Sequence, residues 1–290
     1  MKNQLLLFDP TDAEAVERMN LGQRIQRAID LLRANEPPEG YYLAYSGGKD
    51  STVILELAKL SGVKFEPFYN NTTIDPPDLV RFIKHYHPEV RWNQPPKGPM
   101  FYRIANSTKM PPSRSLRWCC GEFKERGGKG RVKIFGVRAA ESKGRKTRWR
   151  EATISYDNML AICPIVYWLH DQVWEFIKTL NIPYCSLYDE GFDRLGCIGC
   201  PLVSKELRKQ DFAKYPKYEL LWKRAVIKNW EKWHDVINSH TGLPRFSSQF
   251  KTGEDFYAWW LVQGDPDLIT GRCQAAQLWT NIPGVNDDEL

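Results

Sequence analysis

The sequence lacks any long hydrophobic run. No stretch approaches the roughly 18 consecutive apolar residues that identify a membrane-spanning helix. The apolar segment within MKNQLLLFDPTDAEA is also too short for a signal peptide, because acidic residues follow it at once. We therefore expect a cytoplasmic protein with no membrane partner. Its 42% of apolar residues are enough to fill a substantial core.

Because an export signal is missing, the seven cysteines are not expected to form a disulfide framework, since the cytosol keeps thiols reduced. Metal binding or thiol chemistry is the better expectation. Cys119 and Cys120 are adjacent, and Cys197 and Cys200 are separated by two residues. Four thiolates in two close pairs suit either a tetrahedral zinc ion or a four-iron cluster.

Acidic residues are scarce in one part of the chain. Residues 103–150 contain 15 Lys or Arg and only three Glu, whereas the net charge of the whole chain is +6. The remainder is therefore net acidic. Basic charge concentrated in one segment is typical of an anion-binding surface. Nucleotide phosphates alone would account for it, and tRNA or DNA are further partners that it would suit.

The alternation of apolar segments predicts an α/β fold. YYLAY (41–45) indicates a buried strand, and the sequence after the following glycine loop indicates a helix. VKFEPFYN (63–70) indicates the next strand. These elements, within about 30 residues, form a βαβ unit, which implies a Rossmann-like parallel sheet flanked by helices, with ligands at the carboxyl ends of the strands. Further helices are expected at 21–35, 76–87 and 170–180, and further strands at 131–142 and 159–168.

The loop after the first strand, SGGKDS, is suited to an anion. Gly47 and Gly48 permit positive φ and close backbone approach, so successive N–H groups can surround an oxyanion. Ser46, Lys49 and Ser51 add donors, and the N-terminus of the following helix adds partial positive charge. The loop does not match the Walker A pattern, because its two glycines are adjacent.

SGGKDS directly after an apolar strand resembles the PP-loop of the N-type ATP pyrophosphatases, a superfamily that also contains the sulfonucleotide reductases. The resemblance implies that ATP is cleaved between its α and β phosphates and that the substrate is adenylated, with Mg²⁺ bridging the phosphates. It also implies catalytic roles for Lys49 and Asp50. We accordingly expect an N-terminal helical segment (1–35), a PP-loop nucleotide-binding domain (36–203) and a Trp-rich helical extension (204–290).

The two cysteine pairs resemble those that hold the 4Fe-4S cluster of assimilatory adenylylsulfate reductases, as does the text PIVYWLHDQVWEFIKTLNIPYCSLYDEGFDRLGC that leads to the second pair. The resemblance implies a cluster on Cys119, Cys120, Cys197 and Cys200, with structural zinc or four unligated thiols as the alternatives. Lys124 stands where that family has a basic residue near the cluster. It would hold a substrate anion or tune the cluster, unless it is an ordinary surface lysine.

Two more segments supply candidate nucleotide ligands. GVRAAES follows a predicted strand, and in the superfamily this segment faces the nucleotide, so its arginines would clamp phosphate or sulfate; a solvated basic loop is the alternative. NNTTIDPP closes the second strand, where adenine and ribose would lie, unless it is only a polar turn with a helix cap. The candidates are Arg138, Glu141, Ser142, Arg145, Thr72 and Asp75.

Two departures separate the possible reactions. Sulfonucleotide reductases carry a Glu-Cys-Gly-x-His type motif near the C-terminus, which this sequence lacks, and tend to have a degenerate glycine loop, which here is intact. The pattern is more similar to DNA phosphorothioation sulfur-insertion proteins and cluster-dependent tRNA thiolases. The leading hypothesis is an ATP pyrophosphatase that adenylates its substrate for sulfur transfer, with a cysteine desulfurase or thiol donor as partner. A sulfonucleotide reductase with an atypical thiol such as Cys273, and a nucleotide sensor without turnover, are the alternatives.

Overall fold

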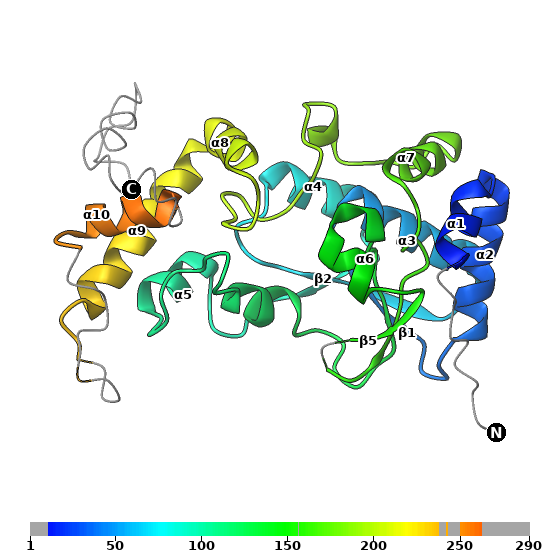
Figure 1. Cartoon of the computed structure of the whole chain (residues 1–290), viewed down its shortest axis with the longest axis horizontal. Helices are drawn as coiled ribbons and strands as arrows, with labels where there is room; N and C mark the ends of the chain where they lie inside the picture. The colour runs from blue at the N-terminus through cyan, green and yellow to red at the C-terminus, as the bar shows by residue number, and fades with distance from the viewer. Residues whose placement is uncertain (1–10, 156, 238–241, 243–249, 263–290) are drawn as a thin grey trace. The chain divides into compact units, whose positions relative to one another are not determined.

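The structure is a computed structural model. Within its described residues, no helix is long and apolar enough to cross a membrane. The described residues are 11–155, 157–237, 242 and 250–262 (Figure 1).

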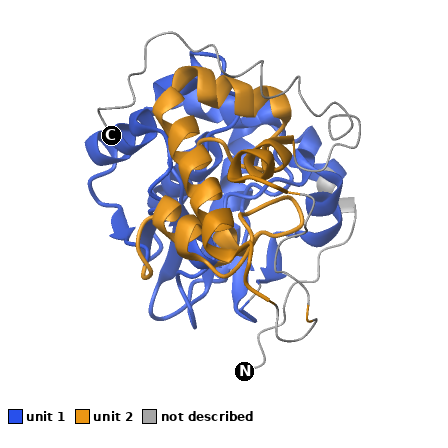
Figure 2. Cartoon of the chain, turned by 90° about the vertical axis from the view of Figure 1, so that its left-hand side faces the viewer, with its two compact units in different colours: residues 1–95, 122–197 blue, residues 96–121, 198–290 orange. Residues whose placement is uncertain are grey.

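The chain forms two compact units. Unit 1 comprises residues 1–95 and 122–197, and unit 2 comprises residues 96–121 and 198–290 (Figure 2). Each unit is therefore built from two separate stretches of sequence. This division differs from the three consecutive segments expected from the sequence. Those segments group residues 96–121 with the strands, whereas these residues belong to the unit of the C-terminal helices.

Unit 1 is built on a sheet with the strand order β3-β2-β1-β4-β6-β5 among the described residues (Figure 1). Every neighbouring pair is parallel except β5 and β6, which are antiparallel. The carboxyl ends of the parallel strands meet at one edge, where ligands of such sheets bind. The predicted Rossmann-like α/β fold is thus confirmed. The strands are β1 (Tyr41–Tyr45), β2 (Phe65–Asn70), β3 (Arg91–Asn93), β4 (Lys133–Ile134), β5 (Ala152–Ile154) and β6 (Leu160–Ile162).

Helices connect these strands and supply much of the core. α2, α3 and α7 pack against one another, and Val53, Ile54, Leu55 and Leu57 of α3 are completely buried. Gly62 ends α3 in the left-handed conformation, with φ of 71°. The helices of unit 1 are α1 (Thr11–Arg18), α2 (Leu21–Ala34), α3 (Lys49–Ser61), α4 (Pro77–Tyr86), α6 (Lys143–Arg148) and α7 (His170–Thr179), with short 3₁₀ turns η2 (Ala139–Glu141) and η3 (Ser186–Tyr188).

The strand expected over residues 131–142 is much shorter than predicted. β4 ends at Ile134, and the chain then leaves the sheet to form η2 and α6. Gly136 marks the departure, because a Cβ at this residue would lie 2.9 Å from the backbone oxygen of Asp50. The chain has to pass the first turn of α3 at close range, which a continued strand of larger residues could not do.

The regular elements of unit 2 among the described residues are helices (Figure 2). Buried polar and aromatic side chains hold them together. Asn229 is completely buried and donates to the carbonyl oxygens of Ile104 and Ser107 at 2.8 and 2.9 Å. The indole N–H of Trp260 donates to the carbonyl oxygen of Pro112 at 2.8 Å. These bonds attach residues 96–121 to the C-terminal helices. The helices are α5 (Met100–Asn106), α8 (Lys205–Lys214), α9 (Pro216–Trp233) and α10 (Gly253–Val262).

The turn between β1 and α3 depends on one glycine. Gly47 has φ of 74°, and a Cβ at this residue would lie 2.6 Å from Cδ1 of Leu79 and 2.9 Å from Cδ1 of Ile83. Gly48 is the N-cap of α3 in an extended conformation and provides no side-chain cap. Conformation and space therefore both require glycine at position 47.

Ser51 closes this turn from inside. Its hydroxyl donates to the carbonyl oxygen of Gly48 at 2.8 Å and accepts the backbone N–H of Ser46 at 3.2 Å. The hydroxyl of Ser46 lies 3.1 Å from that of Ser51. The Ser51 side chain is thus engaged in holding the loop in shape, while Ser46 is exposed at its surface.

Replacing Gly47 by Ala should lower the free energy of unfolding by about 2–4 kcal/mol, because the methyl group enters a filled space in a left-handed conformation. Gly144→Ala is the matched control, since Gly144 lies in α6 and nothing lies within 4 Å of its added Cβ. Urea unfolding of both variants measures the difference. Equal midpoints for the two variants would contradict the steric account of the turn.

Candidate nucleotide-binding site

Lys49 places a buried ammonium group at the first turn of α3. The residue is 4% exposed, and its Nζ donates to the backbone oxygen of Asp193 at 2.8 Å. The same atom lies 3.7 Å from Oδ2 of Asp50 and 5.2 Å from the ring centroid of Tyr188. Burial lowers the pKa of Lys49 below its ordinary value, and the carboxylate of Asp50 opposes that shift. A cation kept beside a loop of backbone N–H groups suits a phosphate ligand.

Tyr188 contacts the glycine loop, although the sequence analysis did not identify it as a site residue. Its hydroxyl accepts the backbone N–H of Lys49 at 2.9 Å. Burial raises the pKa of Tyr188, so the phenol stays protonated. Lys49 has two donors that could face an oxyanion, its backbone N–H and its ammonium group. In this structure, the first donates to the hydroxyl of Tyr188 and the second to the carbonyl oxygen of Asp193. The segment NIPYCSLYDEGFDRLGC, already noted for its resemblance, was the signal that could have found both residues.

Asp50 joins the glycine loop to the segment after β4. Its carboxylate accepts a hydrogen bond from Nε of Arg138, which is 4% exposed. The backbone N–H of Arg138 in turn donates to the carboxylate of Glu141 at 3.1 Å, and Glu141 forms an ion pair with Arg145. The structure thus brings together four candidates from two distant parts of the sequence.

Ser142 has a local role next to this chain of ion pairs. Its hydroxyl accepts the backbone N–H of Arg145 at 3.2 Å and so caps α6. Because the cap fixes where α6 begins, it also fixes the direction in which Arg145 leaves the helix.

Thr72 and Asp75 are engaged in the turn that follows β2. The hydroxyl of Thr72 accepts the backbone N–H of Ile74 at 3.3 Å, and the carboxylate of Asp75 accepts the phenol of Tyr69. Both residues are buried. No described hydrogen bond joins either side chain to the glycine loop, and their predicted role toward adenine and ribose stays a prediction.

Lys124 is tied to the sheet through its backbone. Its carbonyl oxygen accepts the side-chain amide of Asn70 at 2.8 Å, at the end of β2. The residue itself is exposed. Its predicted role toward an anion stays a prediction.

The four candidate metal ligands are all half-buried. Cys119, Cys120 and Cys200 belong to unit 2, and Cys197 is the last residue of unit 1. Within the described part of the chain, no three His, Cys, Asp or Glu residues are gathered to hold a metal ion. The thiols have the right chemistry for an iron-sulfur cluster or zinc, and their role as ligands stays a prediction. Cys273 lies outside the described residues.

Residues 198–200 of the Cys-x-x-Cys loop are held firmly inside unit 2. Gly199 has φ of 68°, and its N–H donates to the carboxylate of Asp211 at 2.9 Å. The indole N–H of Trp222 donates to the carbonyl oxygen of Ile198 at 2.9 Å. Burial raises the pKa of Asp211 to about 6, and the bond from Gly199 limits that rise. The C-terminal helices therefore determine the conformation of the loop that carries Cys200.

Three curated relatives illustrate what the chain is similar to. An uncharacterised protein of Methanocaldococcus jannaschii is 28% identical over 214 residues, which are 68% of this chain and 41% of the relative. A probable FAD synthase of Caenorhabditis elegans is 27% identical over 63% of this chain and 34% of its own length. An adenosine 5′-phosphosulfate reductase of Staphylococcus haemolyticus is 44% identical over 134 residues, 42% of this chain and 53% of the relative.

This chain spans less than half the length of the first two of these relatives. The match to a described protein family is more extensive. Residues 40–203, more than half of the chain, match the phosphoadenosine phosphosulfate reductase domain and include β1, the glycine loop and the ion-paired segment after β4. The chain therefore belongs to the phosphoadenosine phosphosulfate reductase domain family.

Proposed function

We propose that this chain is an ATP pyrophosphatase that adenylates its substrate for sulfur transfer. The observation that carries the proposal is the intact loop with the buried Lys49 at the start of α3. The family match and the relatives named as FAD synthase and adenosine 5′-phosphosulfate reductase support an enzyme that uses nucleotides.

The geometry suggests how the loop would act on ATP. The N-terminus of α3 and the Lys49 ammonium would stabilise negative charge that develops on the departing pyrophosphate. To do so, Lys49 has to exchange the carbonyl of Asp193 for phosphate oxygens. Arg138 holds the carboxylate of Asp50 in place and would itself lie near the phosphates. The chemical purpose is that AMP leaves easily, whereas an oxygen of the unactivated substrate does not.

Mg²⁺ belongs to this proposal as the ion that would neutralise charge on the phosphates of ATP. Asp50 is the carboxylate within the loop, and a protein commonly holds Mg²⁺ through one or two carboxylates together with substrate phosphates. The described residues offer no cage of three ligands. The phosphates of ATP would therefore supply most of the coordination, and Asp50 is the residue that would contribute to it.

Replacing Lys49 by Met, which keeps the volume but removes the charge, should reduce formation of AMP and pyrophosphate from labelled ATP roughly 100-fold. Lys59→Met is the matched control, because Lys59 lies on the same helix but is half exposed and paired with Glu56. The assay is run with tRNA, with DNA and without an acceptor. Equal loss in both variants would contradict the role of Lys49.

The same assay separates two other functions. A sulfonucleotide reductase is favoured by the 44% identity to an adenosine 5′-phosphosulfate reductase. It would release sulfite from adenosine 5′-phosphosulfate or its 3′-phosphorylated form, using an atypical thiol such as Cys273 or one from a partner. Binding of ATP with neither product would identify a nucleotide sensor. Release of AMP and pyrophosphate is expected under the main proposal.

A 4Fe-4S cluster on the two cysteine pairs is a further part of the proposal, with structural zinc as its alternative. Four half-buried thiols and the guanidinium of Arg117, 3.8 Å from Sγ of Cys120, are compatible with a thiolate-ligated centre. A cysteine desulfurase or another thiol donor would supply the sulfur.

Anaerobically purified protein is expected to contain about four iron atoms per chain and to absorb in the iron-sulfur charge-transfer region. Cys197→Ser should abolish both signals, whereas Cys163→Ala, at a completely buried position, should keep them. Iron analysis and absorbance provide the measurement. A colourless protein with one zinc ion per chain would show that the centre is structural zinc.

A nucleic acid is the macromolecular partner that the basic segment 103–150 would suit. The acidic side chains near α6 already form ion pairs, because Glu141 pairs with Arg145 and Glu151 pairs with Arg27. Lys143, Lys146, Arg148 and Arg150 are exposed, and no described acid pairs with any of the four. We propose that this surface, α6 with Arg150, contacts the phosphates of tRNA or DNA.

Neutralising Arg148 and Arg150 together should weaken nucleic-acid binding and reduce the slope of log affinity against log salt by about 1–2. Arg18→Ala with Lys64→Ala is the control, since both residues are exposed and lie outside the basic segment. Fluorescence anisotropy with tRNA and with duplex DNA tells the two partners apart. Binding that does not depend on salt would refute an electrostatic contact.

A further inference from the structure

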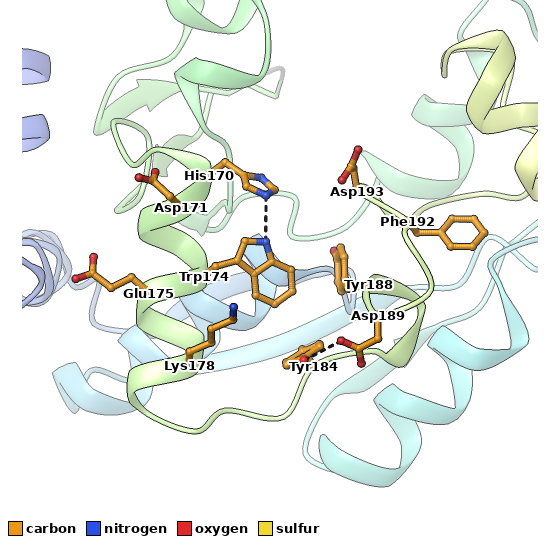
Figure 3. A pocket seen from close by; sticks show the side chains of 10 residues that line it. All are labelled: His170, Asp171, Trp174, Glu175, Lys178, Tyr184, Tyr188, Asp189, Phe192 and Asp193. Atoms are coloured by element: carbon orange, nitrogen blue, oxygen red, sulfur yellow. Dashed lines mark hydrogen bonds between the residues drawn. The ribbon is translucent and has the colours of Figure 1, made fainter.

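A pocket beside the glycine loop has a different chemistry from the loop itself. It has a volume of about 640 Å³ and lies in unit 1, between α7 and the segment 184–193 (Figure 3). Trp174, Tyr184 and Tyr188 supply aromatic rings to its lining, and four acidic side chains with one lysine supply its charge. Neither the nucleotide nor the metal chemistry discussed above uses this combination.

The aromatic rings form a rigid corner. The ring of Trp174 meets that of Tyr184 at 5.1 Å and 82°, and that of Tyr188 at 5.2 Å and 86°. Hydrogen bonds fix two of these rings, because the Trp174 indole donates to Nε2 of His170 at 3.1 Å and the Tyr184 phenol donates to Asp189 at 3.0 Å (Figure 3). A preorganised corner of π faces attracts cations through the negative face of each ring.

The charge of the lining favours the same kind of ligand. Glu175 pairs with the buried Arg24, but Asp171, Asp189 and Asp193 have no ion pair among the described residues. Lys178 is the single opposing charge in the lining. Carboxylates therefore outnumber the one lysine of the lining and would repel phosphate or sulfate. The net charge of the whole chain is +6, but the lining of this pocket is acidic. A phosphate group therefore suits the glycine loop, and a cationic group suits this pocket.

We propose that this pocket binds an organic cation, a small ligand or side chain that carries an ammonium or guanidinium group on an apolar body. The aromatic corner takes the charged group and its methylenes, and the unpaired carboxylates balance its charge. The Tyr188 ring already has one cation close by, the Nζ of Lys49.

Tyr188 connects this pocket to the glycine loop. Its ring lines the pocket, while its hydroxyl accepts the backbone N–H of Lys49. Asp193 connects them in the same way, since its side chain lines the pocket and its carbonyl oxygen accepts the Lys49 ammonium. The cation site therefore adjoins the phosphate site, which is the arrangement expected for a second substrate that reacts beside a bound nucleotide.

The test uses the full chain without nucleotide, so its outcome does not depend on ATP chemistry. Tetramethylammonium is titrated by ligand-observed NMR at constant ionic strength, and neopentyl alcohol serves as the neutral probe of the same shape. Saturable binding of the cation is expected, with at least about tenfold weaker binding of the alcohol. Equal binding of the two probes, or no saturation by the cation, would overturn the proposal.

Three variants locate the binding. Trp174→Leu is expected to weaken tetramethylammonium binding about tenfold and Trp174→Phe to restore most of it, because phenylalanine keeps a π face. Asp189→Asn replaces an exposed carboxylate, so it tests the charge even if Trp174→Leu does not fold, and it should weaken binding severalfold. Tyr86→Leu, at an exposed aromatic residue outside the pocket, should change nothing. Affinity unchanged in the Trp174 and Asp189 variants, or preferential binding of adenosine, would show that the pocket is not a cation site.

Discussion

Burial of the Lys49 ammonium is the constraint on which the rest of the site depends. A buried cation without partners is strongly unfavourable, so the fold has to bring acceptors to it. Asp50 supplies a carboxylate from the same helix turn, and Asp193 supplies a carbonyl oxygen from a segment 144 residues away. The ring of Tyr188 covers the ammonium group. The segment 184–193 therefore contacts the glycine loop directly, although the two are far apart in the sequence.

The same constraint explains the ion pairs around Asp50. Arg138 uses the carboxylate of Asp50, while Glu141 accepts the backbone N–H of Arg138 and forms an ion pair with Arg145. The side-chain charges of Lys49, Asp50 and Arg138 alternate in sign, so the two buried cations share one carboxylate. An entering nucleotide would add negative charge at the end of this chain, where Lys49 can exchange a neutral carbonyl for a phosphate without leaving a carboxylate unpaired. The glycine loop and the neighbouring pocket differ in charge. The loop carries the ammonium group of Lys49, whereas the pocket that Tyr188 also lines is acidic.

Much of this could be predicted from local sequence. The parallel sheet followed from the spacing of apolar segments, and the loop followed from two glycines, a lysine and an aspartate directly after a strand. Tyr188, Asp193 and Gly136 were missed because their roles are contacts with the loop. The resemblance of the segment that holds Tyr188 and Asp193 pointed to a family, but periodicity does not specify which distant residue each of them contacts. The strand expected over 131–142 was too long for a related reason, since the close passage of Gly136 by Asp50 is visible only in three dimensions.

The division into units shows the same limit. Composition separated the Trp-rich C-terminal part from the α/β part, but the bonds from Asn229 to Ile104 and Ser107 attach residues 96–121 to that part. Residue type and near-neighbour spacing were enough to predict the family, the first βαβ unit and the glycine loop, but not β3, β5, α5 or α6. The pairing of the buried charges, the segment that covers Lys49 and the acidic aromatic pocket beside the loop became evident only in three dimensions. Those features arise from burial, which brings together groups that the chain itself keeps apart.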